Sequence, residues 1–158
     1  MSSISFNKDT LGGSLLLKKN ARVLTCVTDG TQRDHFVTIE HINQADGLSL
    51  TLVKKSKDGY IETYIGQANV TTGVIDDGIL VGFEGCFKVK HGHKLEELGA
   101  PLERNDTINV SIELDRVVFS FKNLWEVVFH HDESIDIGIS LWCSGETWVI
   151  GDSKIGET

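Results

Sequence analysis

Residues 107–122 read TINVSIELDRVVFSFK, and this stretch decides the fold class. Apolar and polar residues alternate through its first half, with the period of two that is typical of a strand burying one face. The apolar positions of that half are Ile108, Val110, Ile112 and Leu114. Asp115 and Arg116 then separate it from a second apolar run at 117–122, and a two-residue gap suits a hairpin. The stretch predicts two antiparallel strands, in which each fully buried apolar side chain contributes about 1.5–3 kcal/mol.

Short strands of the same kind are predicted along most of the chain. They fall at 22–28, 35–42, 48–53, 60–65, 79–83, 87–90, 125–129, 135–141 and 146–150. Helical periodicity is almost absent, and the best candidate is one turn within His93–Leu98, which Pro101 would help to end. Sixteen glycines and one proline suit tight turns. About a dozen short strands predict an all-β sandwich or barrel, and 158 residues suit a single domain spanning 1–158.

Alternation also predicts which side chains share a face. In the strand at 35–42, the first face carries Phe36, Thr38, Glu40 and Ile42, and the second carries Val37, Ile39 and His41. In the strand at 48–53, the shared apolar face carries Leu48, Leu50 and Leu52. Trp125 and Trp148 lie inside apolar strands and are expected in the core. Three cysteines, Cys26, Cys86 and Cys143, form no CxxC pair and are expected to be reduced, buried thiols.

Charge argues against nucleic acid as a partner. The formal net charge is −8, with eight Lys and Arg against five Asp and Glu in residues 1–57, and seven against eighteen in residues 58–158. An acidic surface repels phosphate backbones and mildly favours a basic partner, although solubility alone would explain it. No basic segment leads into an apolar one at the start, and no apolar run approaches the roughly 18 residues of a membrane span. We therefore expect a cytoplasmic chain that does not contact the membrane.

Residues 105–123 read NDTINVSIELDRVVFSFKN and resemble the signature of the SPRY domain family. In that family Gly-Asp starts a strand, an Asp ends it, and a second strand closes on a Phe-x-x-Asn-Gly-like turn. The matching residues are Asp106, Asp115, Phe119 and Asn123. The usual glycines are replaced, by Asn105 before the first strand, Asn109 within it and Leu124 after the second.

Other segments follow in the family's order. Leu15–Thr25 resembles the opening strand pair, and the strand at 35–42 resembles the aromatic-rich one, with Val37 where Trp is usual. Gly78–Gly92 and Ile137–Ile150 resemble the stretch before the His-Gly turn and the closing strands, so the resemblance spans residues 14–150. It implies two antiparallel sheets in a bent, concanavalin A-like sandwich. It also implies a ligand surface made by loops at one edge, and no catalytic machinery.

Trp142 is the first candidate for that surface. It follows the strand at 135–141 and precedes the turn signal Cys143-Ser144-Gly145. In peptide-binding SPRY domains an aromatic residue at the end of the matching strand helps to line the recognition pocket. A Trp at a loop mouth offers a large rigid surface and one donor. Alternation places Trp142 opposite the face of Ile139 and Leu141, although a core Trp remains an alternative. Cys143 belongs to the same candidate surface.

Three further residues complete the candidate set. Tyr60 and Tyr64 follow a polar segment and have the same parity, so they share a face, and the family places recognition residues in the neighbouring loop. Packing within an ordinary strand is the alternative. Arg33, in the polar loop at 28–34, could hold a carboxylate, and a solvated turn is the alternative.

Catalysis is not indicated. The chain has no Gly-x-Ser-x-Gly elbow and no glycine-rich phosphate loop. His91 and His93 could share a face and bind zinc, but adjacent His130 and His131 would point to opposite faces and make poor co-ligands. We expect solvated turns at both places, no enzyme, no cofactor and no metal.

These features predict a protein–protein interaction module, a non-enzymatic adaptor that recognises a short peptide or a protein surface through edge loops. The alternative is a carbohydrate-binding lectin, because lectins share the two-sheet architecture. A lectin usually gathers aromatic, Asn, Arg and His side chains on one concave sheet, and no single strand pair here collects them. The identity of the partner and the oligomeric state are left open by the sequence.

Overall fold

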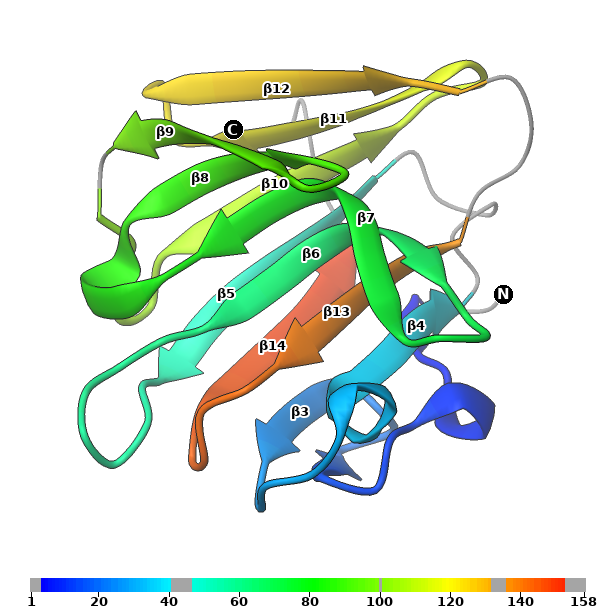
Figure 1. Ribbon diagram of the computed structural model, residues 1–158, viewed down its shortest axis with the longest axis vertical. Coiled ribbons are helices and arrows are strands. Elements are labelled where there is room, and N and C mark those ends of the chain that lie inside the picture. Colours follow the sequence, from blue (N-terminus) through cyan, green and yellow to red (C-terminus); the bar gives the residue numbers. More distant parts are fainter. Residues whose placement is uncertain (1–3, 41–46, 100, 132–135, 153–158) are drawn as a thin grey trace.

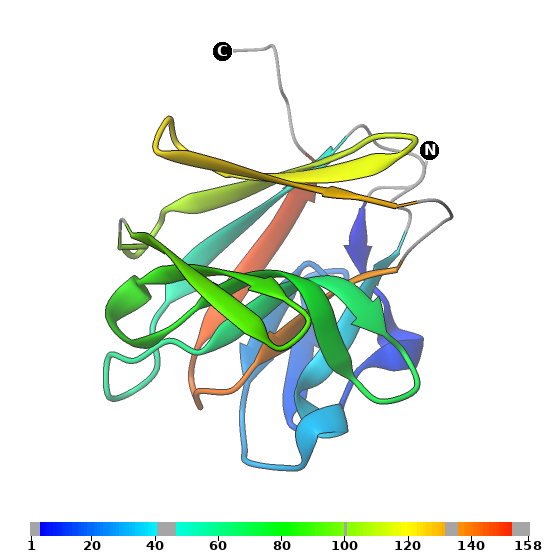
Figure 2. The same cartoon turned by 45° about the horizontal axis from the view of Figure 1, so that its top comes forward.

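The fold is a sandwich of two antiparallel sheets with seven strands each (Figures 1 and 2). The computed structural model describes residues 4–40, 47–99, 101–131 and 136–152. The first sheet runs in the order β1 (Ser5–Phe6), β4 (Phe36–Glu40), β13 (Ile137–Leu141), β6 (Thr63–Asn69), β7 (Val74–Val81), β8 (Phe87–His91) and β9 (Lys94–Gly99). The second runs β12 (Trp125–His130), β11 (Arg116–Phe121), β10 (Thr107–Ile112), β5 (Gly47–Lys54), β14 (Thr147–Asp152), β3 (Val23–Cys26) and β2 (Leu15–Lys18).

The all-β sandwich is therefore confirmed, and the described residues form fourteen strands in place of about a dozen. Short 3-10 turns lie between some of these strands, at η1 (Lys8–Thr10), η2 (Gln32–His35) and η4 (Phe83–Gly85). Within the described ranges, no helix is long and apolar enough to cross a membrane. His41, Ile42 and Ile135, which the sequence assigned to strands, lie outside the described residues.

Inward-facing side chains from both sheets form one core. The predicted face of β5 is confirmed, because Leu48, Leu50 and Leu52 are completely buried. Trp148 is the largest fully buried side chain, which confirms its core assignment. Trp125 packs against the core but is only partly buried, because it lies on β12, an edge strand. Burial of apolar surface at about 25 cal/mol per Å² is the main force that holds the sheets together.

The hairpin at residues 107–122 forms, but its turn is one residue earlier than predicted. Ile112 pairs with Val117, and the Glu113 N–H donates to the Arg116 carbonyl at 2.9 Å, so Leu114 and Asp115 form the tip. Leu114 is 99% exposed as a result, and Ile112 is half-buried. The predicted four-residue apolar stripe is therefore shorter, because backbone pairing places the end of the hairpin beyond the facing sheet.

Three other expectations are wrong. Residues 94–99 form strand β9 and not a helical turn, because pairing with β8 satisfies backbone groups that an isolated short helix leaves exposed. The strand predicted at 79–83 ends at Val81, and Phe83 lies in η4. Cys26 is buried as expected, whereas Cys86 is exposed beside η4 and Cys143 is half-buried.

A glycine pair bends the sheet that carries the candidate site. Gly66 of β6 lies opposite Gly78 of β7, next to a break in the pairing register between Gly66 and Ala68. A Cβ atom on Gly66 would lie 2.2 Å from the Asp77 carbonyl oxygen, so only glycine allows this approach. Bulges of this kind bend strands, and β7 turns sharply along its length in Figure 1. The bend carries the tip of the β6–β7 hairpin toward η2.

We expect Gly66→Ala to lower the free energy of unfolding by about 1–3 kcal/mol, because the added methyl group meets backbone that cannot move away. Chemical denaturation measures this change. Gly82→Ala is the matched control, since its Cβ would meet only the Cys86 carbonyl oxygen at 3.9 Å, an ordinary contact. Its expected change is within about 0.5 kcal/mol. Equal effects of the two substitutions would contradict the close approach.

Candidate binding site

Trp142 lies on the outer face of the first sheet, immediately after β13. Ile139 and Leu141 are completely buried and face the core, and Trp142 continues the alternation onto the opposite face. Its backbone N–H donates to the Glu62 carbonyl at 3.0 Å, which keeps it aligned beside the segment that leads into β6. The side chain is half-buried, and its Nε1 is enclosed without a hydrogen-bond partner.

A buried histidine holds the indole in place. The His35 and Trp142 rings stack with centroids 4.3 Å apart and planes 20° apart. The His35 Nδ1 lies 2.8 Å from the Leu141 carbonyl oxygen, and because that oxygen only accepts, Nδ1 carries the proton. His35 is 1% exposed, so the ring that supports Trp142 belongs to the core. The indole is therefore a rigid surface.

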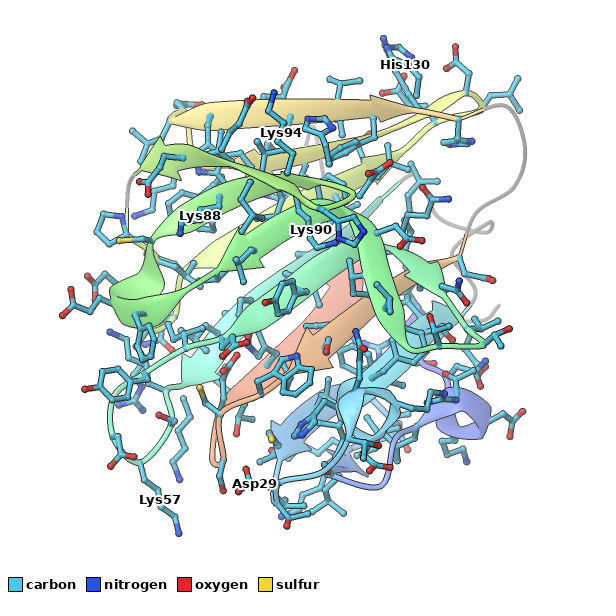
Figure 3. The ribbon with its side chains drawn as sticks, in the orientation of Figure 1. Asp29, Lys57, Lys88, Lys90, Lys94 and His130 are labelled. Carbon is cyan, nitrogen blue, oxygen red and sulfur yellow. The ribbon has the colours of Figure 1, made fainter. Side chains whose placement is uncertain are left out.

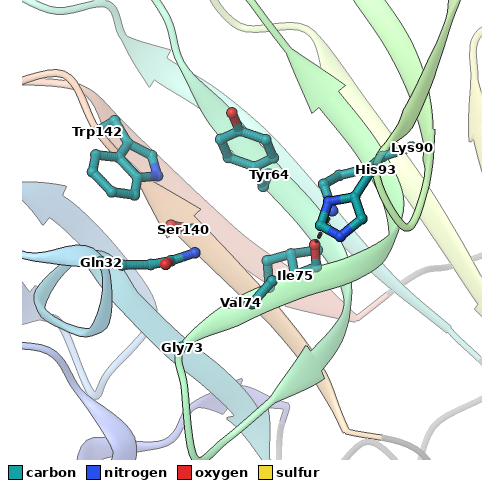
Figure 4. Close-up of a pocket in the computed structure, with 9 residues that line it drawn as sticks. All are labelled: Gln32, Tyr64, Gly73, Val74, Ile75, Lys90, His93, Ser140 and Trp142. Carbon is teal, nitrogen blue, oxygen red and sulfur yellow. Dashed lines mark hydrogen bonds between the residues drawn. The ribbon is translucent and has the colours of Figure 1, made fainter.

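A cavity of about 350 Å³ opens beside Trp142 on the outer face (Figure 4). It is built from β13, β6, the turn η2, the start of β7 with the turn before it, and β8 with the turn after it. The lining residues are Gln32, Tyr64, Gly73, Val74, Ile75, Lys90, His93, Ser140 and Trp142. Figure 4 shows the indole and the phenol ring on one side and Lys90 and His93 on the other. We call this the first cavity.

Arg33 holds two walls of the first cavity together without lining it. Its Nη1 donates to the Thr10 carbonyl at 3.0 Å, and its guanidinium lies over the Phe36 ring at 5.1 Å. Gly73, at the tip of the β6–β7 hairpin, has φ +77°, and a Cβ there would lie 2.9 Å from the Arg33 Cα. The hairpin tip can rest on η2 only because this residue is glycine.

Lys90 supplies a fixed positive charge at the opposite wall. Its Nζ donates to three backbone carbonyls, those of Ile75 at 2.8 Å, Asp76 at 3.1 Å and Gly92 at 2.6 Å. An ammonium group has three donors, so all of them are used. Lys90 therefore fastens the β8–β9 turn to β7 and does not reorient freely toward a ligand. Lys88 and Lys90 both stand on the outer face of β8 in Figure 3.

A second cavity of about 380 Å³ adjoins the first, and Tyr64 lines both. The other lining residues are Ile61, Glu62, Leu80, Gly82, Phe83, Cys86, Lys88 and Glu97. Phe83 is 66% exposed and meets Tyr60 edge-on, with ring centroids 4.8 Å apart. Burial and the neighbouring Glu62 raise the pKa of the Tyr64 hydroxyl, so it stays protonated at neutral pH.

The turn after Trp142 rests on a buried carboxyl group. Glu146 is completely buried and accepts hydrogen bonds from the Trp148 Nε1 at 2.7 Å, the Glu62 N–H at 3.2 Å and the Thr63 hydroxyl. Burial raises the pKa of Glu146 to about 8, although the bonds from Trp148 and Glu62 oppose the shift. Burial likewise raises the pKa of the Cys143 thiol to about 11, so little of it is thiolate at pH 7.

Solved structures identify the architecture. The chain is similar to the PSpry domain of TRIM65, with a TM-score of 0.70 and 10% identity over 96% of this chain and 93% of that one. A human SPRY domain matches with a TM-score of 0.64 and 11% identity over 87% and 94% of the two chains. The SPRY domain of human HERC1 matches with a TM-score of 0.62 and 14% identity over 96% and 99%. This chain has the SPRY fold. No family model and no curated protein sequence matches it.

On this SPRY fold the candidate residues separate into three groups. Trp142 and Tyr64 line the first cavity together, and Tyr60 stands at the rim of the second, against Phe83. Tyr60 lies before β6, but it faces outward on the same side as Tyr64. The alternate residues Ile61, Thr63 and Ile65 are buried and face the core. Arg33 and Cys143 line neither cavity and lie behind the surface.

Several lining residues of the two cavities were missed by the sequence analysis. Gln32 comes from η2, Lys90 from β8 and His93 from the turn after β8, and nothing in the local sequence connects them. The sequence did contain a signal for Phe83, since an aromatic residue between Gly82 and Gly85 is expected in a turn and not in a strand. His91 lies beside Phe129, with ring centroids 5.0 Å apart, while His93 lines the first cavity. Across the described ranges, no three His, Cys, Asp or Glu side chains gather as a metal site requires.

We expect the free energy of unfolding to fall as pH rises from about 5 to about 8, in part through Glu146. Its folded pKa of about 8 lies above the ordinary value of 4.5, so over this range the unfolded state loses a proton that the folded state keeps. Chemical denaturation across this range measures the slope. Glu146→Gln, which keeps an acceptor but does not titrate, should show a shallower fall. Identical slopes in the two proteins would show that Glu146 does not titrate between folded and unfolded states.

Proposed function

We propose that this SPRY-fold chain is a protein-interaction module that binds an extended peptide segment across the first and second cavities. The observation that carries the proposal is the half-exposed Trp142, held rigid by the buried His35 at the mouth of a cavity. Rigid aromatic side chains lose little conformational entropy on binding and are enriched at interaction hot spots. We also propose that the module acts in the cytoplasm and catalyses no reaction.

The two cavities suit neighbouring side chains of one ligand. The first is lined by Gln32, Ser140 and the fixed charge of Lys90, so it suits a polar or acidic side chain. The second is lined mostly by apolar atoms, with Phe83 and Leu80 at its wall, so it suits an apolar side chain. Tyr64 separates the two and offers a surface for the peptide backbone between them.

A peptide-display selection on the purified chain, followed by affinity measurement on the selected peptides, tests the proposal. We expect Trp142→Ala and Tyr64→Ala each to weaken binding by about tenfold or more, a loss of at least 1.4 kcal/mol. Leu114→Ala is the matched control, because Leu114 is 99% exposed and lies on a turn of the other sheet. Its affinity should equal that of the unchanged chain.

Trp142→Ala removes the stack on His35, so thermal unfolding of each variant must accompany the affinity measurement. Gln32→Ala and His93→Ala change the first cavity without touching the core and provide independent variants. Peptides that bind all four site variants as well as the unchanged chain would overturn the proposed surface. Binding to glycans that depends on Trp142 would support the lectin alternative in its place.

A further inference from the structure

Among the described strands the sandwich has four edges, and three of them carry features that discourage pairing with another chain. β1 has two residues, and the Phe6 N–H donates to the Ala21 carbonyl at 2.9 Å. β2 has four residues and ends in Lys18. β9 carries three charged residues, Lys94, Glu96 and Glu97, and its pairing with β8 is broken by a register shift. Short length, charge and bulges are the usual protections of a sheet edge.

The fourth edge, β12, is neither short nor interrupted by a register shift, and Glu126 and His130 are its only charged or titratable side chains. It pairs with β11 through six consecutive residues without a register shift, and its sequence, WEVVFH, is rich in strand-forming residues. In the part of the chain that the structure describes, no strand pairs with its other side. Figure 1 shows β12 as the outermost strand of its sheet. No residue of β12 lines the first or the second cavity.

Strand parity shows which backbone groups of β12 face outward. The His131 N–H donates to the Asp115 carbonyl at 2.9 Å, on the β11 side. The N–H and C=O of a residue point to the same side of a strand, and the side alternates. Odd-numbered residues therefore bond to β11, and the backbone groups of Glu126, Val128 and His130 point to the open edge. The side chains of these three residues are exposed, and Val128 is 38% exposed.

This edge is complementary to itself. When two copies of β12 meet antiparallel with Val128 opposite Val128, the outward-facing backbone groups of both strands coincide as hydrogen-bonded pairs. The same register places Glu126 opposite His130 of the other copy, twice by symmetry. A carboxylate that faces an imidazole gains a hydrogen bond, and like charges do not meet. His130 projects from the edge in Figure 3. Its own cross-strand neighbour, Arg116, is paired with Glu113 at 3.1 Å.

We propose that the chain forms a two-fold dimer by antiparallel pairing of β12 with β12 of a second copy, centred on Val128. The pairing joins the two seven-stranded sheets into one continuous sheet and leaves both cavities open. Six-residue strands bury less than the roughly 1,200 Å² of a standard interface, so the dimer is weak. We expect a dissociation constant on the order of 10–1,000 µM. The proposal does not depend on the peptide-binding function.

Sedimentation analysis of the full chain from about 10 µM to 1 mM tests the proposal. The unchanged chain should show reversible, concentration-dependent dimerisation. Val128→Pro should remain monomeric, because proline removes an outward N–H and blocks the new strand. The same change costs no hydrogen bond to β11, since edge strands tolerate proline where the N–H faces solvent. Circular dichroism and thermal unfolding confirm that this variant is folded.

Charge reversal tests the register. Glu126→Lys should weaken dimerisation by about tenfold, because two lysines then face the two His130 imidazoles. The double variant Glu126→Lys with His130→Glu places an opposite-charge pair at both positions and should recover the dimer. Glu96→Lys makes the same change of charge on β9, the exposed edge of the other sheet, and should leave dimerisation unchanged.

Three results would overturn the proposal. The first is an unchanged chain that stays monomeric at every concentration, because β12 would then pair with a different partner or with none. The second is a Val128→Pro variant that dimerises as well as the unchanged chain, because the contact would then lie elsewhere. The third is a double variant that stays as weak as Glu126→Lys alone, since that would exclude the register centred on Val128.

Discussion

The carboxyl group of Glu146 joins the two sheets beside the proposed binding surface. The Trp148 indole, buried in the core, needs an acceptor for its N–H, and Glu146 provides it. The same carboxyl accepts from Thr63 of the first sheet and from the Glu62 N–H. Glu62 in turn accepts from the Trp142 backbone. The backbone of Trp142 is therefore linked by hydrogen bonds through Glu62 and Glu146 to the buried Trp148 indole.

Backbone geometry shapes the cavities as much as side-chain chemistry does. Gly66 and Gly78 allow β6 and β7 to approach and bend, and Gly73 allows the hairpin tip to rest on Arg33. Through these contacts Gln32 and Tyr64, which lie far apart in the sequence, face one cavity. The structure also contains Asn105 at φ +72°, where the SPRY signature has glycine. Asparagine tolerates this left-handed conformation better than other residues, so the fold survives the replacement.

The sequence predicted the fold class and, for many side chains, which face of the strand they occupy. Alternation placed Trp142 opposite Ile139 and Leu141, and it placed Tyr60 and Tyr64 on one side, as the structure has them. It placed the turn after β10 one residue late, and it read β9 as a helical turn. Both errors have one cause. A turn and an edge strand are set by hydrogen bonds to a neighbouring strand, and no property of the local residues reveals that register.

The sequence by itself determined the all-β class and the outward position of Trp142, because alternation with a period of two can be read from adjacent residues. The arrangement in two sheets was expected from the resemblance to the SPRY family. Only the tertiary structure decided that Lys90, His93 and Gln32 line one cavity with Trp142, that Glu146 is buried, and that β12 is an edge among the described strands. These features depend on the order of strands in each sheet and on where their turns fall. That order is set by pairing between strands that lie far apart in the sequence, so the local residues do not reveal it.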